Sequence, residues 1–148
     1  NRRGFNQLVR FTLSIARRRA EPLTLGWLDL DRFKEINDRY GHEEGDKALK
    51  VMAQLMRSAF READMLVRFG GDEFAVLFAD TDEQGAWIAM QYLAEQVESY
   101  NARKLHPWSL HFSWGLSEFD HNGNDLQQWL KDADEKMYAM KQQRQRAR

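Results

Sequence analysis

Residues 23–30 (LTLGWLDL) constrain the fold of this chain more than any other segment, because they are apolar on both faces of an extended run. Such a run is typical of a strand buried at the centre of a sheet. Two shorter apolar runs, 65–69 and 74–78, are joined across Gly70-Gly71, which is a two-residue β-hairpin signal. A hairpin pairs its strands antiparallel, so an all-parallel sheet is excluded.

The rest of the chain supplies helices and one more strand. Five segments have the character of helices, by apolar periodicity or by their boundaries: 5–19, 32–39, 48–59, 84–99 and about 125–143. Residues 108–117 alternate between apolar and polar side chains, which predicts a half-buried strand with one polar face. We therefore expect an α+β fold in which helices surround a central, mostly antiparallel sheet of about four to five strands.

Composition limits the classes of function. The 148 residues fit one domain over 1–148, and the opening NRRGF without a Met suggests a piece cut from a longer multidomain protein. The absence of cysteine excludes thiolate nucleophiles and cysteine-bound metals, and it favours a reducing compartment. With 22 basic and 23 acidic residues, the chain has no overall basic field for duplex nucleic acid. No apolar run approaches the ~18 residues of a membrane helix.

Two acidic residues, Asp29 and Asp31, stand at the end of the central apolar run, and their spacing places them on one face of the strand. Asp31 has an ordinary explanation as the cap of the helix that begins at residue 32, and we favour that interpretation for it. Asp29 has no such explanation. A carboxylate beside Trp27 and Leu28 lies near apolar surface and needs a partner, most economically a metal ion.

A second acidic pair, Asp72-Glu73, directly follows Gly70-Gly71. Glycines permit a tight turn, and their lack of side chains lets a phosphate or nucleotide approach the backbone. A plain hairpin with solvated acids would be the better explanation if this segment stood alone. Two acidic clusters on neighbouring strand ends, however, are the pattern of a two-metal phosphoryl-transfer site.

Residues 70–74 (GGDEF) form the pentapeptide that names the GGDEF family of diguanylate cyclases, and the chain resembles this family along essentially its whole length. The segments 29–38 (DLDRFKEIND) and 40–46 (YGHEEGD) resemble the family's strand–helix signature in residue type and spacing. The opening 1–5 (NRRGF) is similar to the family's entry helix, and 134–141 (DEKMYAMK) is similar to its closing helix.

The resemblance implies a domain that condenses two GTP molecules into cyclic di-GMP and releases two pyrophosphates, on a fold similar to the palm-like core of nucleotidyl cyclases. By position, Asp29, the carbonyl of Leu30, Asp72 and Glu73 would hold Mg²⁺ (or Mn²⁺), with Asp72 and Glu73 as the catalytic residues. Catalysis would need a homodimer, because each site would hold one GTP. A nucleotide substrate implies a cytoplasmic domain without membrane contact of its own, and it leaves open a membrane anchor elsewhere in the full-length protein.

The resemblance also assigns residues to the guanine base. Asn37, His42 and Asp46 match the positions that read guanine, and a carboxylate can accept hydrogen bonds from the N1–H and the exocyclic amine of that base. Without the family, Asn37 is better explained as a helix-end residue before Gly41. Asp46 is then better explained as an acid that the helix dipole favours near a helix N-terminus.

Phosphate contacts are implied at three places. Phe33 and Lys34 fall in the first turn of the helix after the metal strand, where free N–H groups can cradle a phosphate. Gly70 and Gly71 line the same nucleotide. Lys141 matches the family's triphosphate lysine, although a solvated helix lysine is the default explanation for such a residue.

Beyond Lys141 the chain departs from the family, which usually continues with a glycine, an arginine and an asparagine. This chain has Arg144, Gln145 and Arg146 there. A second phosphate-binding cation would then come from Arg144 or Arg146, and the sequence leaves both open.

Arg61 and Asp64 stand five residues before the Gly-Gly pair. Their spacing is ordinarily that of a surface ion pair. At this position they resemble the family's inhibitory site, where the cyclic di-GMP product binds, since an arginine fork suits phosphate and the Hoogsteen edge of guanine. A second arginine that often supports this site would fall near Tyr92, so we expect moderate rather than tight inhibition.

The leading hypothesis is an active diguanylate cyclase, because the acidic and guanine-reading positions are intact. One alternative is a catalytically weak regulatory module that binds cyclic di-GMP or GTP. Another is a polymerase-like transferase, which the lack of a basic groove disfavours; we expect GTP and cyclic di-GMP as partners and no nucleic acid polymer.

Overall fold

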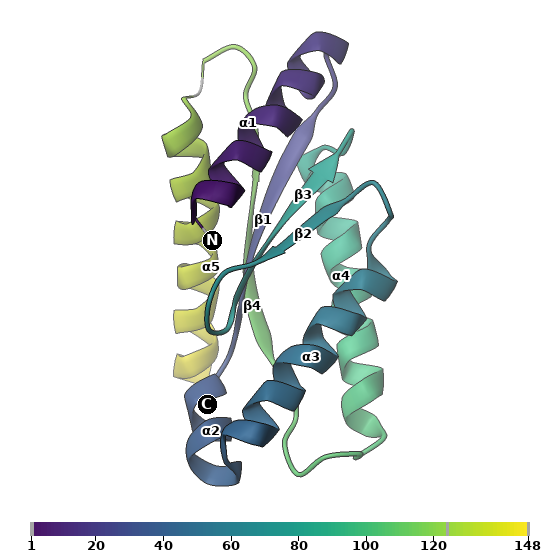
Figure 1. Ribbon diagram of the computed structural model, residues 1–148, viewed down its shortest axis with the longest axis vertical. Helices are drawn as coiled ribbons and strands as arrows, with labels where there is room; N and C mark the ends of the chain where they lie inside the picture. The colour runs from purple at the N-terminus through teal and green to yellow at the C-terminus, as the bar shows by residue number, and fades with distance from the viewer. Residues whose placement is uncertain (1, 124, 148) are drawn as a thin grey trace.

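Figure 1 shows the computed structural model of the chain, which describes residues 2–123 and 125–147. Its elements follow in the order α1 (Arg2–Arg19), β1 (Leu23–Leu30), α2 (Phe33–Tyr40), α3 (His42–Ala59), β2 (Met65–Arg68), β3 (Glu73–Ala79), α4 (Glu83–Ala102), β4 (Phe112–Glu118) and α5 (Leu126–Ala147). Asn1, in the expected entry helix, lies outside the described residues. Over the described ranges, no helix is long and apolar enough to cross a membrane.

The strands form a four-stranded sheet in the order β2-β3-β1-β4, and every pair is antiparallel. β1 lies between β3 and β4 and is buried along almost its whole length. The structure therefore confirms the α+β fold, the antiparallel sheet and the central position of residues 23–30.

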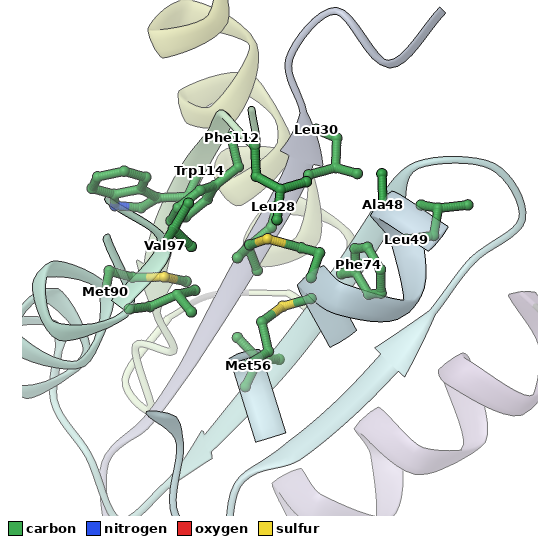
Figure 2. Close-up of a cluster of buried hydrophobic side chains, with 14 of the residues drawn as sticks. Leu28, Leu30, Ala48, Leu49, Met56, Phe74, Met90, Val97, Phe112 and Trp114 are labelled. Carbon is green, nitrogen blue, oxygen red and sulfur yellow. The ribbon is translucent and has the colours of Figure 1, made fainter. Parts of the chain in front are cut away.

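Helices cover both faces of this sheet, with α1 and α5 on one side and α3 and α4 on the other (Figure 1). Leu28, Leu30 and Phe74 point into the core under α3 and α4, where Met56 and Met90 fill the space between the helices (Figure 2). Trp27 packs in the opposite core. Because side chains alternate along a strand, Asp29 shares the α1–α5 face with Trp27.

β4 is shorter than the sequence predicts, and its polar face is covered rather than solvated. The strand spans Phe112–Glu118 instead of 108–117, and Ser113 and Ser117 are both buried. The hydroxyl of Ser117 donates to Asp132 of α5 at 2.8 Å. A Cβ at Gly115 would overlap the main chain of α5. The small residues of this face therefore let a helix approach the strand closely, which alternation alone could not reveal.

The connection between β2 and β3 is longer than the predicted two-residue turn. β2 ends at Arg68, β3 begins at Glu73, and the N–H of Phe69 donates to the Glu73 carbonyl at 3.0 Å. The carbonyl of Asp72 is already engaged, because it accepts a 3.2 Å hydrogen bond from the N–H of Leu30 in β1. Residues 69–72 therefore form a four-residue loop that is tied to the central strand.

Candidate active site

Three groups meet where β1 ends beside α5. The ammonium of Lys141 lies 2.9 Å from Oδ2 of Asp29 and 3.0 Å from the carbonyl oxygen of Leu30. The side chains of Lys141 and Asp29 are 19% and 14% exposed, so the contact is largely shielded from water. The Asp29 carboxylate and the Leu30 carbonyl thus converge on one position that already holds a positive charge. These are two of the oxygens that the sequence predicts as metal ligands.

The surroundings of Asp29 disfavour its negative charge. Among the described residues, its Oδ1 is the one buried side-chain nitrogen or oxygen without a hydrogen-bond partner. Burial, followed by the neighbouring Asp72 carboxyl, raises the pKa of Asp29 from 3.8 to about 7, against the opposing effect of Lys141. Two ionised carboxylates can only accept, so neither satisfies the other unless one holds a proton. A divalent cation would satisfy both.

The structure brings the second acidic pair to the same place. Asp72 lies in the loop that bonds to Leu30, and Glu73 is directly opposite Asp29 in the register of β1 and β3. Opposite residues of an antiparallel pair project to the same face. One oxygen of Glu73 accepts a 3.4 Å hydrogen bond from Nε1–H of Trp27, which orients the carboxylate.

The glycine loop beside these acids is open. A Cβ added at Gly70 or Gly71 would meet no atom of the described residues within 4 Å, and Gly71 has a φ of 73° that favours glycine. Arg68 holds the loop, because its guanidinium donates to the Gly71 carbonyl at 3.0 and 3.3 Å. The loop can therefore receive a ligand against its backbone. Arg68 is a supporting residue that the sequence reasoning missed, although it stands two positions before the glycines.

The prediction that Asp31 caps α2 is wrong. The cap position belongs to Arg32, which has a left-handed backbone and makes no side-chain cap hydrogen bond. Asp31 is instead buried and accepts a 2.7 Å hydrogen bond from the hydroxyl of Ser113 and a 3.4 Å bond from Arg144. Partners on β4 and α5 thus hold its buried carboxylate away from the helix terminus.

Arg144, rather than Arg146, is the arginine of α5 that lies at the site. Its Nη1 donates to the carbonyl of Phe112 at 2.6 Å as well as to Asp31, and its guanidinium lies 5.6 Å from the centre of the Trp114 ring. Arg146 is exposed near the end of the helix. The structure therefore favours Arg144 as the second cation beside Lys141.

The residues assigned to guanine lie along α2 and the first turns of α3. Asn37 is partly buried, and its side-chain oxygen occupies the space where a Cβ of Gly45 would stand. His42 and Asp46 are exposed on α3. Gly45 is a second residue that the sequence reasoning missed, and its small size lets α3 pack against Asn37. The same part of α3 is anchored by Glu44, which accepts a 3.0 Å hydrogen bond from Nε1–H of Trp108.

Phe33 and Lys34 open α2 directly after the end of β1. Phe33 packs against the core, whereas Lys34 is exposed. Because the first N–H groups of a helix have no acceptor within that helix, this turn offers donors to an anion.

Arg61 and Asp64 form the ion pair that their spacing suggests. The guanidinium of Arg61 lies 2.9 Å from Oδ1 of Asp64, and it also donates to the carbonyl of Ala79 at 2.6 Å and to Thr81 at 2.7 Å. The Arg61 side chain is 57% exposed, and both residues line a cavity of about 290 Å³ with Ile88 of α4. The pair lies in a different part of the molecule from Asp29, so the structure separates it from the acidic site.

The site as a whole combines a shielded cation position, a second acidic pair, an open glycine loop and free helix donors. A group of three or more His, Cys, Asp or Glu side chains that could hold a metal does not occur in the described residues, so any metal here would also use the Leu30 carbonyl and ligand oxygens. Magnesium commonly binds in this way, through one or two carboxylates and substrate phosphates. The fold and the site are those expected of a nucleotidyl-transfer domain.

Comparison with known proteins gives the family. The chain belongs to the GGDEF domain family of diguanylate cyclases, because the protein-family model described as "Diguanylate cyclase, GGDEF domain" matches residues 1–147. Among solved structures, the GGDEF domain of TpbB (also called YfiN) from Pseudomonas aeruginosa superposes with a TM-score of 0.86 at 33% identity, covering 97% of this chain and 84% of that one.

Two curated relatives are longer proteins. The probable diguanylate cyclase DgcC of Escherichia coli is 33% identical over 141 residues, which are 95% of this chain and 38% of DgcC. The cyclic di-GMP phosphodiesterase NbdA of Pseudomonas aeruginosa is 36% identical over 133 residues, which are 90% of this chain and 17% of NbdA. The chain thus spans well under half of either relative.

Proposed function

We propose that this domain condenses two molecules of GTP into cyclic di-GMP, with release of two pyrophosphates, and that it uses Mg²⁺ or Mn²⁺. One observation carries the proposal: the Asp29 carboxylate and the Leu30 carbonyl meet at one cation position, beside Asp72 and the open glycine loop. The family supports this reaction, and the GTP substrate would place the domain in the cytoplasm.

The residues present fit a divalent metal. The partnerless Oδ1 of Asp29 and the convergence of Asp29 and Leu30 on one cation are what a metal position requires. Asp29, the Leu30 carbonyl and Asp72 would hold the metal together with phosphate oxygens of the nucleotide, and Glu73 would complete the acidic site. When bound, it would neutralise the triphosphate and lower the pKa of the attacking hydroxyl.

Each half of the reaction joins the 3′-oxygen of one GTP to the α-phosphorus of the other. The bond from that phosphorus to the bridging oxygen of the β-phosphate breaks, and pyrophosphate leaves. In this proposal Asp72 takes the proton of the hydroxyl, and Lys141 binds phosphate oxygens together with the N–H groups of Phe33 and Lys34. Because each site holds one GTP, two domains must face each other, and the active form is a homodimer.

In this proposal, residues of α2 and α3 select guanine. The Asp46 carboxylate would accept from the N1–H and the exocyclic amine, and Asn37, held against Gly45, would bond to the base edge. Exposed His42 lies at the start of the same helix. Adenine does not present the same two donors, so it would leave these groups unpaired.

The test is incubation of the chain with GTP and Mg²⁺, followed by chromatography of the products. Two forms are compared: the chain alone, and the chain fused to a dimerising coiled coil that raises the effective concentration of facing sites. We expect cyclic di-GMP from both, with a rate per protein that rises with concentration for the unfused chain. No product from the fused form at saturating GTP would overturn the proposal.

A second candidate function is binding of cyclic di-GMP at Arg61 and Asp64. The observation that favours it is a cavity of about 290 Å³ lined by both residues, with the Arg61 guanidinium already fixed by three acceptors. In an active cyclase this would be an inhibitory product site. In a catalytically weak regulatory module it would be the main function, and the chain would then bind the dinucleotide without producing it.

A further inference from the structure

We propose that Lys141 occupies the metal position when no nucleotide is bound, so that the domain takes up its divalent metal together with a nucleoside triphosphate and not before it. This inference rests on the proposed function, because it takes the oxygens of Asp29 and Leu30 as the metal site. It goes beyond that function by assigning an order to the two ligands.

The geometry makes Lys141 and a metal exclusive at this position. The ammonium lies 2.9 Å from Asp29 Oδ2 and 3.0 Å from the Leu30 oxygen. A magnesium ion bound to the same oxygens would lie about 2.0–2.1 Å from each. The ammonium and the metal would then stand within van der Waals contact, both positive and both shielded from water. Binding of the metal therefore requires the ammonium to leave.

The neighbouring cation, the guanidinium of Arg144, is held in its place more firmly than the Lys141 ammonium. Arg144 is held by the Phe112 carbonyl at 2.6 Å and by Asp31 at 3.4 Å, and its guanidinium lies over the Trp114 ring, 5.6 Å from the ring centre. Lys141 has a flexible stem, and its ammonium lies 3.9 Å from Asp31 in addition to its two closer contacts. A planar guanidinium with three partners stays fixed, whereas a lysine on a long stem can swing to a new anion.

A triphosphate supplies that new anion. Without a triphosphate, an entering metal displaces the Lys141 ammonium from its two closest oxygen partners. The ammonium then has no new anion to bind, and the two cations repel each other. With a triphosphate, the ammonium exchanges the Asp29 carboxylate for phosphate oxygens, and the metal takes the vacated carboxylate and carbonyl. Metal and nucleotide therefore raise each other's affinity by the same factor, as linkage requires.

The experiment measures Mn²⁺ binding by electron paramagnetic resonance at pH 8 without nucleotide. Lys141→Met removes the competing ammonium, and we expect it to bind Mn²⁺ at least about tenfold more tightly than the unaltered chain. Lys141→Gln is a second variant of the same kind. Lys136→Met is the matched control, because Lys136 lies on the same helix and donates to a strand carbonyl, Leu116, away from Asp29; its Mn²⁺ affinity should be unchanged.

The titration is repeated with a non-hydrolysable GTP analogue, which should strengthen Mn²⁺ binding to the unaltered chain far more than to Lys141→Met. Equal or weaker Mn²⁺ affinity in both folded Lys141 variants without nucleotide would overturn the inference. Asp29→Asn in the Lys141→Met background separates this failure from failure of the proposed function. If that double variant binds Mn²⁺ less well than Lys141→Met does, Asp29 is a metal ligand, and the comparison of the Lys141 variants tests only the competition between ammonium and metal. If the double variant binds Mn²⁺ as well as Lys141→Met does, the assignment of Asp29 as a metal ligand fails.

Discussion

Gly115 of β4 lies directly beneath Ala133 of α5, so closely that a Cβ at residue 115 would overlap the Ala133 carbonyl oxygen. This contact sets the distance between α5 and the sheet. Since α5 carries Lys141 and Arg144, the same contact sets the position of both cations relative to Asp29 and Asp31.

Gly115→Ala and Gly70→Ala should separate stability from function. Gly115→Ala forces a methyl group into the backbone of α5, which cannot move aside as a side chain would. We expect the free energy of unfolding to fall by on the order of 3 kcal/mol. The second adds a methyl group in open space, so stability should stay within about 0.5 kcal/mol, while GTP turnover falls because the methyl blocks the loop. Urea unfolding and a turnover assay measure the two effects. Equal stability of the two variants would contradict this account of the β4–α5 contact.

Asp29 should make the metal-free chain less stable as the pH rises. The folded carboxyl keeps its proton up to a pKa of about 7, whereas the unfolded one loses it near 3.8. Between these values the folded state binds more protons, so this contribution to stability is full at low pH and falls by at most about 1.4 kcal/mol per pH unit. It is lost once the pH has passed 7.

The measurement is the difference in unfolding free energy between Asp29→Asn and the unaltered chain, at pH 5 and at pH 8 with a chelator. Titrating groups that do not interact with Asp29 cancel in this difference. We expect the variant to gain relative stability at pH 8, and Mg²⁺ with GTP analogue to stabilise only the unaltered chain. The same difference at both pH values would show that Asp29 ionises normally.

Asp46→Ser should weaken the preference for GTP over ATP. Loss of a carboxylate that accepts two donors of guanine costs on the order of 1–3 kcal/mol, which is about 5- to 150-fold in discrimination. Competition between ATP and GTP for the chain measures this, and Asp38→Ser, an exposed acid on α2, is the control. Unchanged discrimination in Asp46→Ser would remove Asp46 from the guanine site.

Arg61→Ala should weaken binding of cyclic di-GMP by at least about tenfold, because a charge-assisted hydrogen bond contributes about 1.5–3 kcal/mol. The initial rate on GTP should change little, since Arg61 lies apart from Asp29. Titration calorimetry and product-inhibition curves test both parts, with exposed Arg57→Ala as the control. If Arg61→Ala and the unaltered chain bind the dinucleotide equally, the Arg61–Asp64 pair is only a surface ion pair.

Much of this site was predictable because its signals are local. The double-faced apolar run locates β1, and the adjacent acids mark its end. Asp31 shows where local reasoning stops. Its spacing before a helix suggests a cap, but its partners Ser113 and Arg144 are 82 and 113 residues away in sequence. Only the packing of β4 and α5 brings them to it.

The serines of β4 show a second limit. Alternation of polar and apolar residues predicts a wet face when nothing is known of the neighbours, yet Ser113 and Ser117 are buried under α5. Likewise the sequence marks Lys141 as a phosphate ligand by resemblance. Only the tertiary structure shows that the Lys141 ammonium forms an ion pair with Asp29.

The most direct test of cyclic di-GMP synthesis by this domain is a mass balance on the dimerised chain with GTP and Mg²⁺, compared with Asp72→Ala. We expect two GTP to be consumed and two pyrophosphates to be released for each cyclic di-GMP formed. We also expect Asp72→Ala to lose several orders of magnitude in turnover at an unchanged melting temperature. Near-normal turnover in Asp72→Ala would rule out a catalytic role for Asp72, and GTP consumed without the cyclic product would rule out the proposed reaction.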